Sequence, residues 1–242
     1  MRRKAFFKFF ITVRSIQKDT IVAEEISFVG GSQNCCVCFI DIVDSTRITT
    51  VEIADSEKIK IYYSVFINTM AAIVRNFDGT IIKNTGDSLI YYFPKTMGHV
   101  GNGNVTNFKN VFECGLTMLA VHPIMNVKLK EKGLPDLSYR ISADYGKVEV
   151  AKSLTSTSED LFGPTVNLCS KINSKAYPNQ MVIGNNLYQI TRSTLGNNEY
   201  HFNKADEYPI DSNSKNQYPV YSVFDKNHKN NDDRVKMYEN IV

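Results

Sequence analysis

The 242-residue sequence has no apolar run that approaches the ~20 residues an α-helix needs to span a bilayer. Its start, MRRKAFFKFFITV, is basic like a secretory signal, but Lys8 interrupts the apolar stretch and no small-residue cleavage site follows. We therefore expect a cytoplasmic protein in which residues 1–34 are an N-terminal extension, with a helix packed on its own domain. A helix that lies on a membrane or pairs with a second subunit is the open alternative.

The sequence also lacks paired C-x-x-C spacing and any long basic block. Its five cysteines (Cys35, Cys36, Cys38, Cys114 and Cys169) include three on one apolar segment, which cannot all pair with one another. We expect buried, reduced thiols. The formal net charge of +3 is too small to favour a nucleic-acid partner, which directs attention to a small-molecule substrate.

The composition does provide for a substantial core. With 43% hydrophobic and 22% charged residues, the chain resembles one globular domain with extensions, and it contains no internal repeat. We place this domain at residues 35–224. Residues 225–242 are polar enough for a mobile tail, with a short terminal helix as the alternative.

The order of apolar patterns predicts alternating strands and helices. Residues 35–43 form a continuous apolar run typical of a strand buried on both faces. Apolar residues then recur at three- and four-residue spacing over about 52–77, which predicts a helix, and GTIIKNTGDSLIYYF predicts a hairpin over 80–93. A second helix is expected near 106–131, where Pro123 should kink or split it.

The segment LSYRISADYGKVEVAK predicts two strands that meet at Tyr145 and Gly146. The resulting order β, α, β, β, α, β is that of an α+β, ferredoxin-like split βαβ unit, with helices on one side of a mostly antiparallel sheet. C-terminal α/β additions should supply one more helix at about 165–176 and two or three strands, the last in PVYSVF.

Two aspartates interrupt otherwise apolar strand patterns. Asp41 lies in CCVCFIDIVDST and Asp87 in the hairpin segment KNTGDS. If the strand and the hairpin are neighbours in one sheet, both carboxylates can reach the same edge, where they suit Mg²⁺ or Mn²⁺ bridging phosphates. Taken singly, Asp41 is equally well explained as a helix N-cap, and Asp87 is better explained as a turn residue.

Four segments in order resemble the class III nucleotide cyclases, the adenylate and guanylate cyclase catalytic domain. FIDIVDST resembles the family motif F-x-D-I-x-G-[FS]-T, and KNTGD matches K-x-x-G-D. ISADYGKVEV follows, and DLFGPTVNLCSK resembles D-x-[WF]-G-x-x-V-N-x-x-[SA]-[RK]. The resemblance covers about residues 33–224.

The resemblance implies that Asp41 and Asp87 hold two Mg²⁺ or Mn²⁺ ions, assisted by the backbone carbonyl of Ile42. One ion would acidify the ribose 3′-hydroxyl and the other would neutralise the phosphates, so that attack on the α-phosphorus expels pyrophosphate. Lys83 and Asp160 would recognise the base. An ammonium donor and a carboxylate acceptor complement adenine, whereas guanine needs the opposite polarity, so ATP is favoured.

Thr46 and Phe162, which lie in the matched motifs, are further implied substrate contacts. Asn167 resembles the asparagine that orients the ribose, and Lys171, one helical turn later, replaces an arginine that stabilises charge on the transferring phosphate. Lysine keeps the charge but lacks the planar fork, so we expect low turnover or none. Asp44 replaces a usual glycine; it either lies beside the phosphates or caps the next helix.

The family builds each active site from two subunits, one giving the metal aspartates and the other the base-recognition and phosphate-stabilising residues. Because this chain has both sets, the resemblance implies a homodimer with two equivalent sites. We thus expect an adenylate cyclase, with Lys204 and Lys215 as candidate ligands of the distal phosphates. The alternative is a weak or inactive cyclase-fold module that binds nucleotide or a partner protein. A diguanylate cyclase is disfavoured because no GG[DE]EF-type turn is present.

Overall fold

The computed structural model describes residues 26–28, 31–98, 105–153, 159–195, 199–210, 217–226, 231–236 and 238. The strands are β1 (Ile26–Phe28), β2 (Gln33–Ile42), β3 (Thr80–Asn84), β4 (Ser88–Phe93), β5 (Tyr139–Ser153), β6 (Glu159–Phe162), β7 (Gln180–Gly184), β8 (Tyr200–Pro209) and β9 (Gln217–Asp225). The helices are α2 (Ser45–Arg47), the π-helical turn η1 (Ile48–Glu52), α3 (Ser56–Asn76), the 3₁₀ turn η2 (Pro94–Thr96), α4 (Val105–Glu131), α5 (Pro164–Asn173), α6 (Asn185–Thr194) and α7 (Asn231–Lys236). None of the helices described is long and apolar enough to cross a membrane.

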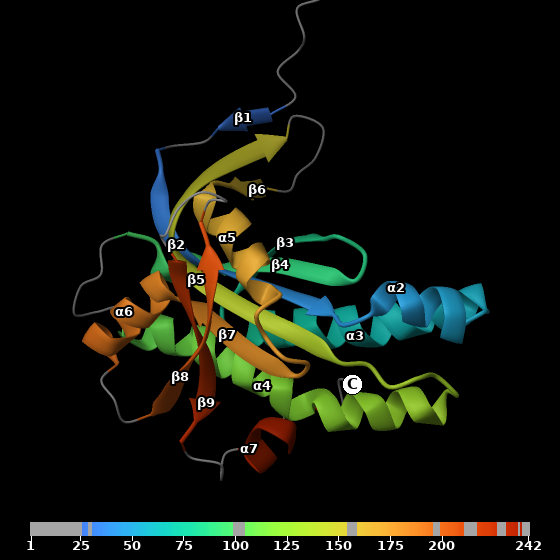
Figure 1. Ribbon diagram of the computed structural model, residues 1–242. Coiled ribbons are helices and arrows are strands. Elements are labelled where there is room, and N and C mark those ends of the chain that lie inside the picture. Colours follow the sequence, from blue (N-terminus) through green and yellow to red (C-terminus); the bar gives the residue numbers. More distant parts are fainter. Residues whose placement is uncertain are drawn as a thin grey trace, which may run out of the picture.

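One sheet runs through the domain in the strand order β3-β4-β2-β5-β7-β9-β8 (Figure 1). Along this order the strands are antiparallel, except that β5 and β7 are parallel. The first four strands, together with α3 and α4, form the predicted ferredoxin-like βαββαβ unit. β1 and β6 pair with β5 away from this path. The predicted α+β fold with a mostly antiparallel sheet is confirmed.

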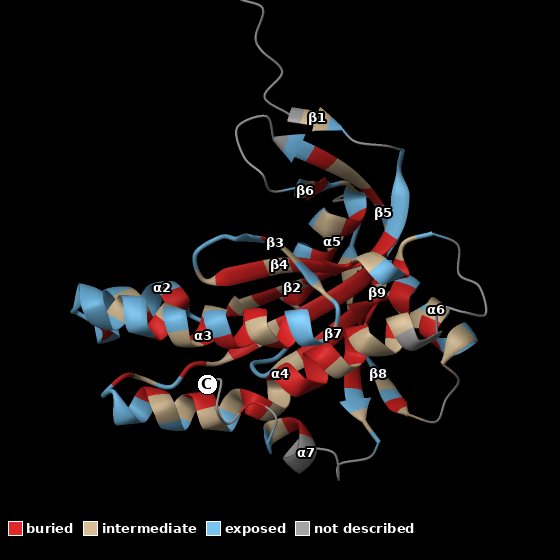
Figure 2. Cartoon of the chain, turned by 180° about the vertical axis from the view of Figure 1, so that it is seen from behind, coloured by how far each residue is buried: buried red, intermediate tan, exposed pale blue. Residues whose placement is uncertain are grey.

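Strand β2 is covered on both faces, as its continuous apolar run predicts. Cys36 and Ile40 are buried in the main core against α3 and α4, whereas Cys35 and Val37 face a second cluster that includes Cys169 of α5. Figure 1 shows α5 on one side of the sheet, and Figure 2, seen from behind, shows the buried faces of α3 and α4 on the other. All five cysteines are free and buried.

The prediction of two strands meeting at Tyr145 and Gly146 is wrong. β5 runs unbroken for 15 residues through both positions. A Cβ at Gly146 would lie 2.6 Å from the hydroxyl oxygen of Thr165, so the glycine makes room for the start of α5. A glycine that allows close approach of two elements has the same sequence pattern as a turn glycine.

The helices also differ from the predicted ones. α3 begins at Ser56 and not near residue 52, because the Asp55 carboxylate accepts hydrogen bonds from the first-turn backbone N–H groups. α4 continues through Pro123 without splitting. Val121 and Met125, on either side of the proline, are fully buried in the core, which compensates for the lost backbone hydrogen bond. α6 has no counterpart among the predicted elements.

The two ends of the chain refine the expected domain bounds. Residues 1–25 of the N-terminal extension lie outside the described residues. The helix expected in MRRKAFFKFFITV falls within that range. Ile26–Phe28 forms a strand that pairs with the end of β5, and β2 begins at Gln33, before the predicted domain start at residue 35. At the other end, the short helix is the alternative that is observed. Tyr238, which follows it, is buried in the main core.

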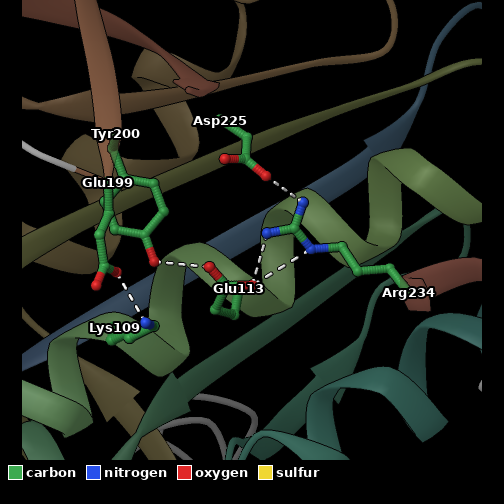
Figure 3. Close-up of polar contacts among 6 residues, drawn as sticks. All are labelled: Lys109, Glu113, Glu199, Tyr200, Asp225 and Arg234. Carbon is green, nitrogen blue, oxygen red and sulfur yellow. Dashed lines mark hydrogen bonds and ion pairs between the residues drawn. The ribbon is translucent and has the colours of Figure 1, made fainter. Parts of the chain in front are cut away.

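An ionic cluster fixes α7 to the domain (Figure 3). The Arg234 side chain is only 8% exposed and donates hydrogen bonds to Glu113 of α4 at 2.6 Å and to Asp225 of β9 at 2.7 Å. Burial opposes the charged guanidinium, but its hydrogen bonds to the two carboxylates leave the pKa of Arg234 above the ordinary value. The Tyr200 hydroxyl donates to Glu113 at 2.7 Å.

Candidate active site

Asp41 and Asp87 lie together where β2 ends beside the β3-β4 turn. Asp41 is opposite Ser88 in the β2-β4 register, and the backbone N–H of Ile42 donates to the backbone carbonyl of Asp87 at 3.1 Å. Ile42 itself is buried. The two strand-breaking carboxylates therefore meet at one edge of the sheet, as their positions in the sequence predict.

The Asp41 carboxylate is incompletely satisfied. Its Oδ1 is buried and has no hydrogen-bond partner among the residues that the structure describes. Burial raises the pKa of Asp41 to about 6, while the Arg140 guanidinium opposes the rise and the Asp87 carboxylate adds to it. Arg140 lies opposite Asp41 in the β2-β5 register, and within the described part of the chain its Nε is also buried without a hydrogen-bond partner. A buried carboxylate oxygen without a hydrogen-bond partner lowers the stability of the fold. Such an oxygen is typical of a site where a ligand binds.

The turn between β3 and β4 orients Asp87. Gly86 has φ of 91°, where a Cβ would be strained, and its N–H donates to the Asn84 side chain at 2.9 Å. The hydroxyl of Ser45, the first residue of α2, donates to the Asp87 carboxylate. The motif KNTGD thus presents Asp87 to the start of α2.

These two aspartates fit a magnesium or manganese site that a substrate helps to complete. Across the described ranges, no group of three or more His, Cys, Asp or Glu residues could hold an ion alone. Mg²⁺ is usually held by one or two carboxylates, water and substrate phosphates, and not by an all-protein cage. The unpaired Oδ1 of Asp41 supplies a ligand atom of the required type.

Lys83 and Asp160 form an ion pair that joins the hairpin to β6. The Lys83 ammonium donates to both carboxylate oxygens of Asp160, at 3.1 and 2.8 Å. A β-bulge between Ile81 and Lys83 places Lys83 opposite Ile90, on the sheet face that also contacts β6. The two side chains are 46% and 36% exposed, so both remain accessible to a ligand.

A small cavity lies beside this ion pair. It has a volume of about 240 Å³ and is lined by Ile82, Tyr92, Glu159 and Leu161, with Thr80 and Ile81. Ligand pockets for drug-sized molecules usually measure ~300–1,000 Å³. This cavity is therefore smaller than the usual pocket for a drug-sized ligand.

Helix α5 presents Asn167 and Lys171 on one exposed face, four residues apart. Gly163 precedes the helix with φ of 131°, and a Cβ there would lie 3.0 Å from the backbone oxygen of Lys147. Pro164 is the first helical residue. The Phe-Gly-Pro sequence thus fixes where α5 starts and, with it, both side chains.

The Lys171 ammonium lies over the Tyr208 ring of β8, 5.9 Å from its centroid. This is a cation–π contact. Tyr208 is partly buried against the cluster that includes Ile172 and Val220. The lysine that replaces the family's arginine therefore has a partner from β8, which limits where its charge can lie.

Asp44 adopts left-handed backbone geometry, with φ 56° and ψ 27°, at the N-cap position of α2. Within the described ranges its side chain makes no capping hydrogen bond. The cap role considered for Asp44 is thus not observed, and the positive φ explains why glycine suits this position. Aspartate and asparagine tolerate the left-handed region better than other non-glycine residues.

We expect Asp44→Ala to lower the free energy of unfolding by about 1 kcal/mol, since a nonpolar L residue is strained in the left-handed region. Asp44→Asn, which tolerates this conformation, and Asp44→Gly should unfold near the wild-type denaturant midpoint. Chemical denaturation measures all three. Equal destabilisation by alanine and asparagine would contradict a conformational cause.

The other residues that the sequence predicts for the site come from several different segments of the chain. Thr46 is exposed, and its backbone carbonyl accepts from Thr50 at 2.6 Å. Phe162 contacts Phe28 of the N-terminal segment. Lys204 is paired with Glu207, and Lys215 lies outside the described residues.

No sequence pattern predicts that Arg140, Ser45 or Tyr208 lies beside the candidate site residues. Arg140 faces Asp41 only through the β2-β5 register, and Tyr208 meets Lys171 only through the position of β8. The motif FIDIVDST contains Ser45, but its bond to Asp87 depends on the neighbouring hairpin. These contacts join segments distant in sequence, so no local pattern indicates them.

A family model described as the adenylate and guanylate cyclase catalytic domain matches residues 29–224. This range is well over half of the chain, and it spans the sheet, the aspartate edge and α5. The chain thus contains the catalytic domain found in class III nucleotide cyclases. It belongs to the adenylate and guanylate cyclase catalytic-domain family. Members of this family bind a nucleotide substrate, generally use Mg²⁺ or Mn²⁺ and commonly dimerise.

Solved structures of cyclases share the fold. The guanylyl cyclase Cya2 has 19% identity and a TM-score of 0.68, over 80% of this chain and 93% of that chain. The adenylyl cyclase CyaB from P. aeruginosa has 19% identity and a TM-score of 0.69, over 82% and 97%. At such identity the likeness concerns the fold and not the substrate.

A curated relative is the cytidylate cyclase of Staphylococcus aureus, which is 28% identical over 166 residues. The match covers 64% of this chain and 37% of the relative, so the chain spans little more than a third of that relative's length. The named relatives thus differ in the base of their nucleotide.

Proposed function

We propose that this protein is an adenylate cyclase that converts ATP to 3′,5′-cyclic AMP and pyrophosphate. The Lys83–Asp160 contact is the observation that best supports this assignment. Adenine presents an exocyclic amine beside a ring-nitrogen acceptor, which complements a carboxylate beside an ammonium. Guanine presents an oxygen beside a ring N–H, so the same pair would place an acceptor against an acceptor and a donor against a donor.

CTP is the second candidate substrate. Cytosine also presents an exocyclic amine beside a ring-nitrogen acceptor, so Lys83 and Asp160 complement cytosine and adenine equally well. The relative named as a cytidylate cyclase favours this candidate. The ion pair therefore selects amino bases over oxo bases, and the space around the base must decide between purine and pyrimidine.

The proposed reaction assigns a separate task to each group of residues. Asp41 and Asp87, with the carbonyl of Ile42, would hold two Mg²⁺ or Mn²⁺ ions. When bound, these ions supply Lewis acidity that favours the ribose 3′-oxyanion and neutralises the phosphates. Asn167 would orient the ribose, and the Lys171 ammonium would stabilise charge on the α-phosphate during attack. A single point charge in place of an arginine fork favours modest turnover.

The experiment that tests base recognition compares Asp160→Asn with the wild type on ATP, CTP and GTP. An amide can donate as well as accept, so we expect the preference for ATP over GTP, as the ratio of kcat/KM values, to fall about 10- to 100-fold. Asp78→Asn is a matched control, because Asp78 also pairs with a lysine at 2.8 Å. An unchanged ratio would refute the role of Asp160.

The proposed assembly is a homodimer in which each site takes its metal aspartates from one subunit and its other residues from the second. A mixture of Asp41→Asn and Asn167→Ala proteins tests this composition directly. Each mixed dimer would have one intact site, so an equimolar mixture should recover about a quarter of wild-type activity. If each site lies within one chain, mixing two inactive proteins recovers none.

A further inference from the structure

The N-terminal strand β1, the end of β5, and β6 form a small three-stranded sheet, with β5 in the middle (Figure 1). Ala151 of β5 is opposite Phe28 on one side and opposite Asp160 on the other. Residues directly opposite in antiparallel strands share a face, and so do residues two apart in one strand. Phe28, Asp160 and Phe162 therefore lie on the same face.

The two phenylalanines form an exposed aromatic pair. Their ring centroids are 5.8 Å apart with planes at 69°, an edge-to-face arrangement. Ala151 between them is fully buried and has only a methyl group, which leaves room for Phe28 to reach across β5. Phe28 is 62% exposed and Phe162 is 37% exposed, so this pair covers little of the core and leaves ring surface accessible.

The chemistry beside these rings indicates what they could bind. Asp160 lies on the same face and is bonded to Lys83, which gives an acceptor and a donor next to an aromatic surface. Nucleobases combine a flat π-face with hydrogen-bonding groups on their edge. Stacking on aromatic side chains stabilises bound bases whatever their identity, while edge contacts give selectivity.

We propose that Phe28 and Phe162 together form a platform on which the base of the substrate triphosphate stacks. The inference rests on the proposed function and adds Phe28, from the N-terminal segment, as a substrate contact. The platform supplies affinity for any base, and the Lys83–Asp160 pair selects those with an exocyclic amine. Movement of β1 away from β5 would remove half of this platform.

The test is equilibrium binding of non-hydrolysable ATP and CTP analogues to the whole chain. Stacking on an aromatic ring predicts that Phe28→Ala weakens both analogues about 5- to 100-fold and leaves tripolyphosphate binding unchanged. Phe28→Tyr should retain binding. Because Phe28 is largely exposed, the alanine variant should fold, which its unfolding midpoint verifies. Phe224→Ala, at a ring 39% exposed on β9, is the matched control and should bind normally.

Unchanged analogue affinity in Phe28→Ala would overturn the platform, and so would equal weakening of tripolyphosphate. Dissociation of a dimer by the same substitution would show that the rings contact a second copy of the chain instead. A wild type that binds the analogues without making cyclic product refutes the cyclase proposal alone. In turnover, the platform predicts a raised KM with little change in kcat.

Discussion

Asp41→Asn protein is expected to form cyclic nucleotide at least about 10²- to 10³-fold more slowly than the wild type. The amide cannot supply the charge that holds a divalent ion beside Asp87, so the ribose hydroxyl and the phosphates lose their main electrostatic stabilisation. Rates measured with Mn²⁺ at saturating nucleotide test this expectation. Asp136→Asn, at an exposed ion-paired carboxylate, serves as the matched control and should retain activity.

The same substitution should stabilise the metal-free protein at pH 8 by about 1–2 kcal/mol, after allowing for partial exposure of the group. Burial raises the pKa of Asp41 from its ordinary value to about 6, so the charged form costs stability above that pH. Below about pH 3 the Asp41 carboxyl is protonated in both the folded and the unfolded chain, and the gain should vanish. If Asp41→Asn lowered the free energy of unfolding at pH 8 in the presence of a metal chelator, this would contradict an unfavourable burial of the Asp41 charge.

Arg234→Met is expected to lower the free energy of unfolding by about 3–5 kcal/mol. It leaves Glu113 and Asp225 partly buried without their shared cation (Figure 3). For a chain of this size the expected fall in Tm is about 6–20 °C. Differential scanning calorimetry measures it.

The control for Arg234→Met is Lys236→Met, which removes an exposed cation from the same helix. This change should shift Tm by no more than about 1–2 °C. A small effect of Arg234→Met would mean that α7 contributes little to the domain. Loss of α7 alone, with the sheet intact, would appear as a separate early transition.

The fold could be predicted from sequence wherever local pattern and tertiary setting agree. The apolar run at 35–43, the hairpin turn at Asn84 and the helical spacing before Phe77 each require one kind of element, and each is observed. Gly146 is the instructive exception. Its missing side chain serves the approach of α5, and that need lies in a helix about twenty residues away.

The candidate site also contains residues that the sequence indicates and residues that only the fold brings together. Asp41 and Asp87 stand out in the sequence because a charge in an apolar strand lowers stability unless it binds a partner or a ligand. The partners that orient the site, such as Arg140 and Tyr208, come from distant strands and depend on register. Phe28 lies in a segment without any sequence signal, and only its pairing with β5 brings it near Asp160.

The choice of substrate also depends partly on residues that the sequence indicates and partly on the shape of the folded site. In the proposed base site, the donor at Lys83 and the acceptor at Asp160 would distinguish amino from oxo bases, but they would not distinguish adenine from cytosine. The family contains cyclases named for different bases, so family membership leaves this choice open. In the proposed dimer, the size of the site between the two subunits would decide between adenine and cytosine.

The most direct test supplies the wild-type protein with ATP, CTP, GTP and UTP in equal amounts with Mn²⁺ and identifies the cyclic products by mass spectrometry. The proposal predicts 3′,5′-cyclic AMP as the main product, with cyclic CMP as the only competitor. Both should disappear in the Asp41→Asn protein. Cyclic GMP or cyclic UMP as the main product would contradict base selection by Lys83 and Asp160, and nucleotide binding without any cyclic product would contradict the enzyme.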